Sequence, residues 1–283
     1  MYSLRPKKSL GQHFLRDDTI ARKIAGAIDP RPDDHMLEIG PGDGALTMHL
    51  AGRTASLVVV EIDPRGAEAV REKFDALGVV VREEDILTTD ITALAHVTGG
   101  LLRVAGNIPY NITSPIVFHL LEHRASLKDI TLMMQREVGR RLVAGPRTKE
   151  YGILAVTCQL YADVEALFDV SPNAFFPKPR VTSSVVRLSL LPGPRYPLSD
   201  EPHFRAMVRA VFGKRRKTLR NSLSYFLGAP LPEGKTTIDL RRRPEELSLA
   251  ELTQLSNELV ARRLLPPDRT GTPTTTQQRS PAP

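Results

Sequence analysis

Cysteine is almost absent from this sequence, and tryptophan is missing altogether: Cys158 is the single cysteine among 283 residues. One cysteine excludes an internal disulfide and leaves no cysteine cluster for structural zinc, so we expect neither a disulfide-stapled secreted protein nor a metal site. Cys158 lies in the apolar run ILAVTCQLY, and we interpret it as a small buried residue.

Long hydrophobic runs are missing as well. The longest apolar run is too short to cross a bilayer, and the first ten residues, MYSLRPKKSL, lack the apolar stretch of a secretory signal. These absences lead us to expect a cytoplasmic protein without a membrane partner. The length predicts one large domain and one small domain.

Basic residues are in excess and unevenly placed. Lysine and arginine number 39 against 32 acidic residues, which gives a net charge of +7 and a pI near 9.7. Residues 203–223, HFRAMVRAVFGKRRKTLRNSL, hold seven of these cations and no acid. This concentration of charge predicts a polyanionic partner.

Short apolar runs alternate with helical patterns in the first half of the chain. We expect strands at residues 36–39, 57–60, 79–82, 101–105 and 130–134, and helices at 19–28, 45–52, 64–77 and 114–122. This alternation predicts an α/β fold with a parallel sheet covered on both faces. Residues 153–161 and 184–190 have the length and spacing of a closing antiparallel pair of strands.

Four prolines in residues 191–202 then interrupt the pattern and predict a linker. Beyond it we expect helices at 204–212, 217–227 and 249–262, the last with Ser248 as its N-cap. The segment 266–283 has almost no apolar residues, which is typical of disorder. We therefore divide the chain into domains 1–195 and 196–265 and a tail 266–283.

Three expected strands end on residues that suit a nucleotide. The first runs into Gly40, Gly42 and Gly44, whose small size lets the backbone turn sharply and approach a ligand. Glu61 follows Gly40 by 21 residues, where a Rossmann-like fold places the acid that binds ribose, and Asp85 ends the third strand. Each signal alone is weak, but together they predict a ligand site at the carboxyl edge of the sheet.

The order of the glycines distinguishes between nucleotides. The pattern here is E-x-G-x-G-x-G, whereas dinucleotide sites have G-x-G-x-x-G, so a nicotinamide dehydrogenase is disfavoured. Glu38 precedes the loop, and a carboxylate there is unfavourable beside a pyrophosphate. It suits a cationic ligand, for which we expect S-adenosylmethionine.

The fourth strand ends in an unusual polar turn, VAGNIPYNITSP. An exocyclic amine such as adenine N6 is a poor nucleophile because its lone pair is delocalised, and the Asn107 oxygen plus a main-chain carbonyl of this turn would draw it towards tetrahedral geometry. Tyr110 offers a ring for stacking and Pro109 stiffens the turn. The alternative is an ordinary strand-end turn.

A base extruded from RNA needs a second aromatic wall, and residues 171–185, SPNAFFPKPRVTSSV, contain adjacent phenylalanines. We predict that Phe175 is the wall, with Lys178 and Arg180 at phosphates. The competing interpretation, two core phenylalanines in a loop, remains open.

In order along the chain, KKSLGQHFL, LEIGPGDGALT, VVEID, EEDIL, VAGNIPYNITSPI, AFFPKPRVTSSVVRL and FGKRRKTLRNSL resemble the ribosomal RNA adenine N6,N6-dimethyltransferases, especially the small-subunit enzymes. The resemblance extends to about Leu265. It implies a Rossmann-like class I methyltransferase domain with a seven-stranded, mostly parallel sheet, plus a small all-helical C-terminal domain. It also implies dimethylation of two adjacent adenosines in the 3′-terminal hairpin loop of 16S rRNA, and a role as a late checkpoint in small-subunit assembly.

The resemblance assigns roles at the cofactor pocket. His13 and Leu15 line it, Gly40 meets the methionine end, Glu61 the ribose and Asp85 the adenine amine, while Asn107 lies at the methyl group. Many relatives have asparagine where this chain has His13, and a histidine ring can still donate an N–H.

The basic segment GKRRKTLR is interpreted as helical and as the RNA contact. Its cations are Lys214, Arg215, Arg216, Lys217 and Arg220. The apolar residues at helical spacing around it should form the small domain's core: Val208, Phe212, Leu219, Leu223 and Phe226. The partner implied is the immature small ribosomal subunit, and we expect a monomer.

Two alternatives remain. A large-subunit RNA dimethylase of the macrolide-resistance type shares the catalytic motifs, although SLGQHFL and FGKRRKTLRNSL favour the small-subunit enzymes. A non-catalytic assembly factor could keep the fold, but the intact NIPY motif argues against it.

Overall fold

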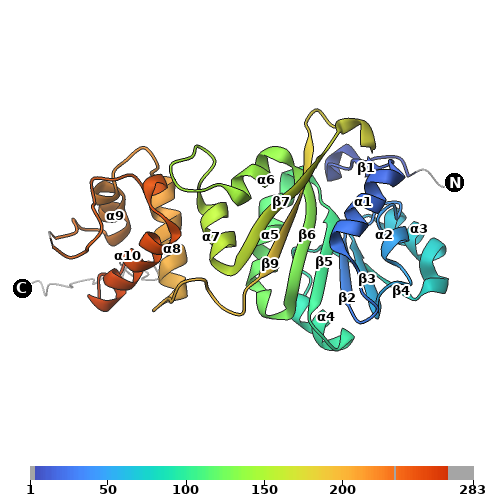
Figure 1. The fold of residues 1–283 in the computed structure, drawn as a ribbon, viewed down its shortest axis with the longest axis horizontal. Coiled ribbons are helices and arrows are strands. Elements are labelled where there is room, and N and C mark those ends of the chain that lie inside the picture. The colour runs from blue at the N-terminus through green and yellow to red at the C-terminus, as the bar shows by residue number, and fades with distance from the viewer. Residues whose placement is uncertain (1–3, 233, 267–283) are drawn as a thin grey trace, which may run out of the picture. The chain divides into compact units, whose positions relative to one another are not determined.

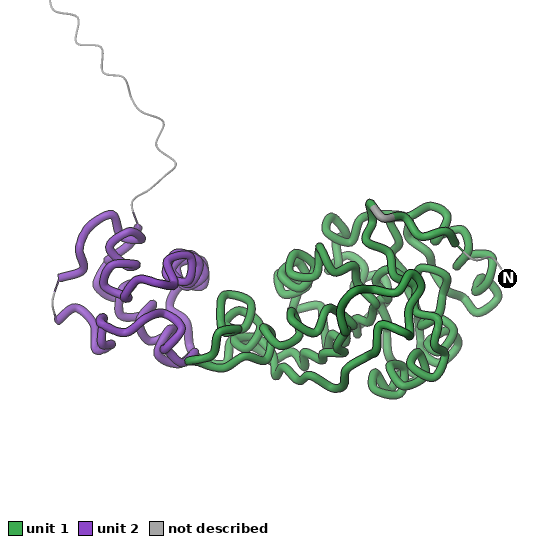
Figure 2. The backbone as a smooth tube through the Cα atoms, turned by 90° about the horizontal axis from the view of Figure 1, so that it is seen from above, with its two compact units in different colours: residues 1–196 green, residues 197–283 purple. Residues whose placement is uncertain are grey.

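The computed structural model describes residues 4–232 and 234–266 (Figure 1). The chain forms two compact units (Figure 2), and the boundary between them lies between Tyr196 and Pro197, within the proline-rich segment. The expected tail from 266 lies, apart from Pro266, outside the described residues. None of the helices in the described ranges is long and apolar enough to span a membrane.

Unit 1 is built on a seven-stranded sheet of order β4-β3-β2-β5-β6-β9-β7. The strands are β2 (His35–Ile39), β3 (Ser56–Glu61), β4 (Val79–Glu83), β5 (Leu102–Asn107), β6 (Leu127–Gln135), β7 (Ala162–Val170) and β9 (Ser183–Leu190). Strands β2 to β6 pair in parallel, and β9 pairs antiparallel with β6 and β7. The predicted α/β fold with a mostly parallel sheet is confirmed.

Helices flank this sheet (Figure 1). They are α1 (Asp18–Ile28), α2 (Thr47–Leu50), α3 (Pro64–Phe74), α4 (Ile91–Thr98), α5 (Thr113–Glu122), α6 (Arg136–Val143) and α7 (Ile153–Tyr161). Short 3-10 helices of unit 1 lie at Lys8–Leu10 (η1), Asp75–Leu77 (η2), Tyr110–Ile112 (η3), Arg124–Ser126 (η4) and Pro172–Ala174 (η5). A further one, Pro244–Glu246 (η6), belongs to unit 2. Aspartates at the N-caps of α1, α3 and α4 accept hydrogen bonds from the first-turn amides, which satisfies groups that the helix itself cannot.

The register brings the ligand-type residues to one edge. Ile39 lies opposite Val60 on β3 and Gly106 on β5, so the residues after these strands are neighbours. The switch point of the sheet therefore lies between β2 and β5, as expected for a ligand site at a carboxyl edge.

One predicted strand is wrong. Residues 153–161 form helix α7, and the edge strand that pairs with β9 is β7. The run ILAVTCQLY is apolar at nearly every position, and such a run fits a buried helix as well as a strand. The true strand carries the alternating signal, with acids at Asp163, Glu165 and Asp169 between apolar residues.

A second, two-stranded sheet joins distant parts of the chain. Strand β1 (Phe14–Leu15) pairs antiparallel with β8 (Phe175–Phe176), so Phe14 lies opposite Phe176 and Leu15 opposite Phe175. This pairing fixes the N-terminal segment beside the loop that follows β7.

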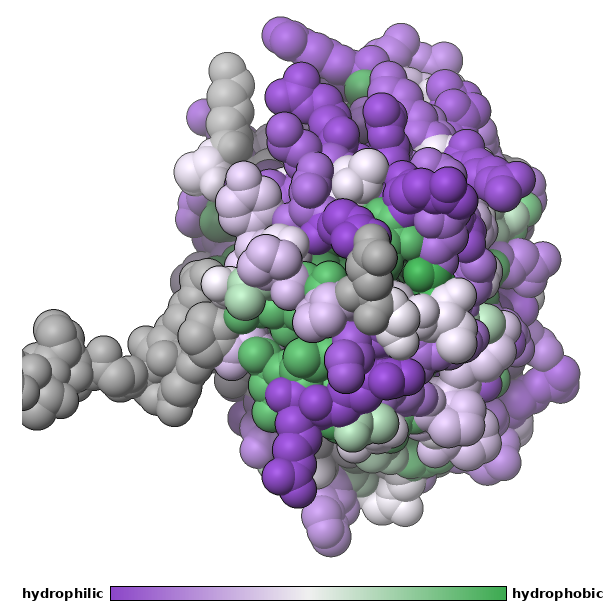
Figure 3. Space-filling model, turned by 90° about the vertical axis from the view of Figure 1, so that its left-hand side faces the viewer, coloured by the Kyte–Doolittle hydropathy of each residue, from purple (hydrophilic) through white to green (hydrophobic). Residues whose placement is uncertain are grey.

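Unit 2 contains α8 (Glu201–Gly213), α9 (Leu219–Leu227) and α10 (Leu249–Ala261). Ser248 caps α10 in a reciprocal capping box with Glu251, as the sequence predicts. The predicted core is confirmed, since all five apolar residues are buried: Val208, Phe212, Leu219, Leu223 and Phe226. On the face of the molecule shown in Figure 3, hydrophilic side chains surround a smaller hydrophobic area.

The helical interpretation of the basic segment is wrong in part. Residues 214–217 form a turn between α8 and α9, and only Arg220 lies in a helix. Helix α8 ends at Gly213, and four consecutive cations would repel one another along a continued helix.

Candidate functional site

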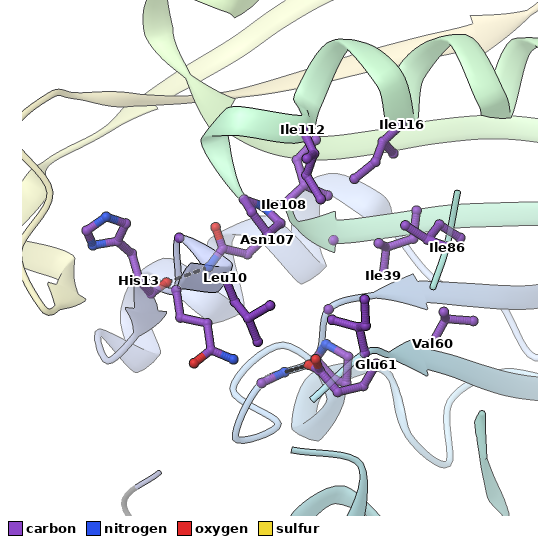
Figure 4. A pocket seen from close by; sticks show the side chains of 18 of the residues that line it. Leu10, His13, Ile39, Val60, Glu61, Ile86, Asn107, Ile108, Ile112 and Ile116 are labelled. Carbon is purple, nitrogen blue, oxygen red and sulfur yellow. Dashed lines mark hydrogen bonds between the residues drawn. The ribbon is translucent and has the colours of Figure 1, made fainter. Parts of the chain in front are cut away.

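A cavity of about 270 Å³ lies at the carboxyl edge of β2, β3 and β5 (Figure 4). Its walls come mainly from residues 9–15, 38–43, 45–46, 60–62, 84–87 and 106–112. Every residue that the sequence assigns to the cofactor lines it: His13, Leu15, Gly40, Glu61, Asp85 and Asn107.

The glycine loop after β2 packs too closely for side chains. Gly42 has a φ of +59°, and a Cβ there would lie 2.9 Å from the ring of Phe14. The neighbouring strand β5 approaches as closely, since a Cβ at its Gly106 would lie 2.6 Å from the Ile39 carbonyl oxygen. The loop therefore presents bare backbone to the cavity, as the motif predicts.

Glu61, at the end of β3, has a carboxylate that is fixed in place by backbone hydrogen bonds. It is 6 % exposed, and its carboxylate accepts hydrogen bonds from the backbone N–H groups of Gly42 (3.2 Å) and Asp63 (2.9 Å). Burial raises the pKa of this carboxyl. Its position in the cavity wall suits hydrogen bonds from vicinal hydroxyls of a sugar.

Glu38 is a deeply buried carboxyl near the end of β2. It is 1 % exposed, and its Oε2 has no hydrogen-bond partner within the described part of the chain. Burial, reinforced by the negative charge of Glu61, raises the pKa of Glu38 to about 8. The direction of this shift means that the folded protein binds the Glu38 proton more tightly than a free glutamate does, and that a cation beside Glu38 would oppose the shift.

Asp85 follows β4 and is half-buried in the cavity wall. Its Oδ1 accepts a hydrogen bond from the Leu87 amide at 2.9 Å, and its main-chain carbonyl accepts from the Thr88 hydroxyl at 3.0 Å. These contacts fix the turn that brings the carboxyl to the cavity.

Asn107 ends β5 and is held by the N-terminal segment. Its Nδ2 donates to the main-chain carbonyl of His13 at 3.0 Å (Figure 4). Because the amide nitrogen is used in this way, the side-chain oxygen is directed elsewhere and can accept from a ligand.

The His13 ring makes other contacts. It stacks on Tyr110 with ring centroids 5.5 Å apart, and its Nδ1 lies 2.7 Å from the Pro177 carbonyl oxygen. The Tyr110 hydroxyl is 2.6 Å from Ser183 Oγ, and burial raises the pKa of Tyr110. Histidine at position 13 thus reaches Asn107 through its backbone, which any residue supplies; a role for the ring towards a cofactor remains a prediction.

The predicted aromatic wall, Phe175, is buried, and its role towards a base stays a prediction. Phe175 is 5 % exposed and packs in the hydrophobic core with Leu15, whereas Phe176 is 56 % exposed. Adjacent residues of a strand point to opposite faces, and the pairing with β1 turns Phe175 inward. Phe176 is the exposed ring of the pair.

Most of the predicted RNA-contact cations are exposed. Lys178, Arg180, Lys214, Arg216 and Lys217 are exposed, as is Arg220. Arg215 is half-buried and lies 3.8 Å from a Glu245 carboxylate oxygen.

Sequence reasoning missed Asp63, two residues after Glu61. It is 1 % exposed in its side chain and bonds Lys7, Gln12 and Arg65. The Asp-Pro pair that opens α3 signals a helix N-cap, but nothing local signals partners more than 50 residues away.

Comparison with known proteins agrees with the resemblance seen in the sequence motifs. The family model of ribosomal RNA adenine dimethylase matches residues 3–260. The chain is 42 % identical over 260 residues to a ribosomal RNA small subunit methyltransferase A from Magnetococcus marinus, covering 90 % of this chain and 92 % of the relative. It is 46 % identical to the protein of that name from Chlorobium chlorochromatii, covering 88 % and 92 %.

Two solved structures share the fold. A dimethyladenosine transferase from Plasmodium falciparum superposes with a TM-score of 0.72 at 24 % identity, over 89 % of this chain and 98 % of its own. The 23S rRNA methyltransferase ErmE gives a TM-score of 0.61 at 30 % identity, over 85 % and 99 %.

Proposed function

The chain belongs to the ribosomal RNA adenine dimethylase family, and on that premise we propose that it dimethylates N6 of two adjacent adenosines in the 3′-terminal hairpin loop of 16S rRNA. The names of relatives at 42 % and 46 % identity support the small-subunit substrate. The large-subunit enzyme named above is 30 % identical, which makes the macrolide-resistance reaction the second candidate.

The cavity fits S-adenosylmethionine as methyl donor. The cofactor is a sulfonium and ammonium cation, and a buried glutamate with an unpartnered oxygen gains a charge partner from such a ligand. Glu38 would face the cationic part, Glu61 the ribose hydroxyls and Asp85 the adenine amine. When bound, the cofactor supplies an electrophilic methyl group.

The observation that carries the proposal is the orientation of Asn107. With Nδ2 committed to the His13 carbonyl, Asn107 Oδ1 accepts one N6–H of the target adenine. A main-chain carbonyl of the same turn accepts the other, so that the nitrogen lone pair leaves conjugation with the ring. Positioning of this kind can lower the activation barrier by about 7 kcal/mol or more at best. A strong base is unnecessary, since the nitrogen becomes acidic on methylation and its proton passes to water.

Tyr110 holds the base for this step. Its ring is buttressed by the His13 ring on one side and fixed by the Ser183 hydroxyl, so that it presents an immobile surface. Stacking on such a ring is worth about 1–3 kcal/mol. Phe176 is our candidate for the second wall, in place of Phe175.

The two units divide the work in this proposal. Unit 1 carries the chemistry, and the exposed cations of unit 2 bind phosphates of the small-subunit RNA. An immature small subunit as partner, a checkpoint role in its assembly, a monomeric state and a cytoplasmic location complete the proposal.

Labelled S-adenosylmethionine tests it. The protein is incubated with under-methylated small subunits or with large-subunit RNA, and modified bases are located by reverse-transcription stops. We expect label at two adjacent adenosines of the small-subunit hairpin. Label in large-subunit RNA alone would contradict the proposed small-subunit substrate. Tight binding to the small subunit without label would indicate an assembly factor.

A further inference from the structure

Asp63 is an unusually well-bonded carboxylate beside the cofactor site. It caps α3 by accepting from the Arg65 backbone N–H at 3.3 Å, and Arg65 Nη2 lies 2.6 Å from its Oδ2. Its own backbone N–H donates to Glu61 at 2.9 Å. Asp63 therefore touches both helix α3 and the acid that we assign to the ribose.

Two further partners of Asp63 come from the N-terminal segment. Lys7 Nζ lies 3.2 Å from Oδ1, and Gln12 Nε2 lies 3.1 Å from Oδ2. The Lys7 backbone N–H donates to Gln12 Oε1 at 2.8 Å, which closes the segment into a loop. We call residues 5–13 the N-terminal strap; Arg65 Nη1 also donates to its Arg5 carbonyl at 3.2 Å.

The middle of the strap rests on the catalytic turn. Gly11 has a φ of +62°, and a Cβ there would lie 3.0 Å from Asn111 Oδ1 and 3.8 Å from Pro109 Cβ. Residues 9–13 line the cavity, so the strap is one of its walls.

The C-terminal end of the strap contacts Asn107. The His13 carbonyl accepts from Asn107 Nδ2, and Asn107 is the residue assigned to the target amine. The strap is thus attached beside the ribose acid through Lys7 and again through Gln12. The residue after Gln12, His13, accepts the hydrogen bond from the catalytic amide (Figure 4).

We propose that Asp63 is a latch, a positioning residue that fastens the N-terminal strap across the cavity and so sets both the residence time of the cofactor and the orientation of Asn107. This inference rests on the proposed function for its catalytic part. Its structural part, the attachment of the strap, does not.

The strap needs such an anchor. Its only regular structure is the three-residue helix η1, which cannot be stable by itself because helix nucleation is unfavourable. Asp63 offers charge-assisted bonds in a nearly inaccessible position, and these are among the strongest polar contacts. The Arg65 guanidinium, with Gln12 and Lys7, holds the pKa of Asp63 well below its usual range, so the latch stays charged across the neutral range.

The test is Asp63→Asn, which keeps the size and one oxygen but removes the charge. Amide hydrogen exchange is measured without cofactor, and cofactor dissociation is measured by displacement. We expect exchange at residues 7–13 of the strap and the cofactor off-rate to rise roughly tenfold to a hundredfold, from the loss of charge-assisted bonds. We expect kcat to fall with them.

Asp90→Asn is the matched control. Asp90 also caps a helix after a sheet strand, accepting from the Ala93 N–H at 2.9 Å, and it lies outside the contacts of the strap. It should leave strap exchange and the cofactor off-rate unchanged.

A second variant guards against damage to α3. Lys7→Met with Gln12→Met removes the bonds to Asp63 from the strap side, together with the bond inside the strap from the Lys7 N–H to Gln12, and leaves Asp63 with Arg65. It should reproduce the faster strap exchange while α3 stays protected. Unchanged strap exchange in this double variant overturns the latch, whatever Asp63→Asn does. Absence of cofactor binding to the unaltered protein would refute the proposed function instead, and the exchange result would still decide the attachment.

Discussion

The side-chain amide of Asn107 donates to the main-chain carbonyl of His13 across 3.0 Å, joining a strand tip to a segment 94 residues earlier. An amide that donates through nitrogen presents its oxygen elsewhere. The contact therefore converts an asparagine at the end of β5 into an oriented acceptor, and it does so through a backbone atom.

Asn107→Ala is the first prediction. It removes the acceptor for the target amine, and loss of one oriented polar group of this kind costs about 10²–10³-fold in kcat. The dissociation constant for S-adenosylmethionine, measured by calorimetry, should change less than about threefold, because Glu38, Glu61 and Asp85 remain. Equal losses in turnover and cofactor affinity would contradict the role assigned to Asn107.

Glu38 makes stability depend on pH in a defined direction. Its pKa is about 8 in the folded protein against 4.5 as the reference value, so the folded state holds the extra proton between these pH values. The raised pKa of Glu38 therefore contributes fully to the free energy of unfolding below pH 4.5. This contribution is lost as the pH rises towards 8, by up to about 1.4 kcal/mol per pH unit. Urea unfolding of the cofactor-free protein between pH 5 and 8 measures this slope.

Glu38→Gln should flatten that slope, because the amide does not titrate. Glu68→Gln, at an exposed position of α3, is the control and should keep it. Parallel slopes for the unaltered protein and Glu38→Gln would show that Glu38 is ionised in the fold.

The two phenylalanines of β8 should behave differently. Phe176→Ala removes an exposed ring, so it should leave thermal unfolding nearly unchanged and raise the KM for RNA by about 5-fold to 150-fold, equivalent to about 1–3 kcal/mol of stacking. Phe175→Ala removes a core ring and should cost about 3–5 kcal/mol of stability. An RNA defect in a stably folded Phe175→Ala variant, with none in Phe176→Ala, would restore the original assignment.

Arg216 and Lys217, in the exposed basic turn of unit 2, should contact phosphates. Alanine at either position should weaken binding to small-subunit RNA and lower the slope of log K against log salt by about 1. Lys235→Ala, elsewhere on unit 2, is the control. A slope that is unchanged at 216 and 217 would place the RNA on another surface. Arg215 is a poorer test, since it already faces Glu245.

The sequence predicted what local chemistry determines. Gly40 follows β2, and Glu61 and Asn107 are the last residues of β3 and β5. The apolar runs of these strands are unambiguous, and parallel pairing necessarily brings their ends together. Buried cores such as that around Leu219 and Leu223 follow from helical spacing in the same way.

What the sequence did not predict depends on distant contacts. The run at 153–161 fits helix or strand until its neighbours are known. Phe175 and Phe176 differ only through the pairing of β8 with β1, and Asp63 gains Lys7 and Gln12 only when the N-terminal strap is in place. The pKa of Glu38 likewise depends on burial that no local pattern reveals.

The most direct test of the account is a crystal structure with S-adenosylhomocysteine, the demethylated cofactor, and an RNA hairpin carrying the target adenosine. The account predicts adenine N6 at about 3 Å from Asn107 Oδ1, the base against Tyr110, and the cofactor sulfur facing N6 from the glycine loop. A target amine that is out of reach of Asn107, or a cofactor bound away from the β2–β5 edge, would contradict it.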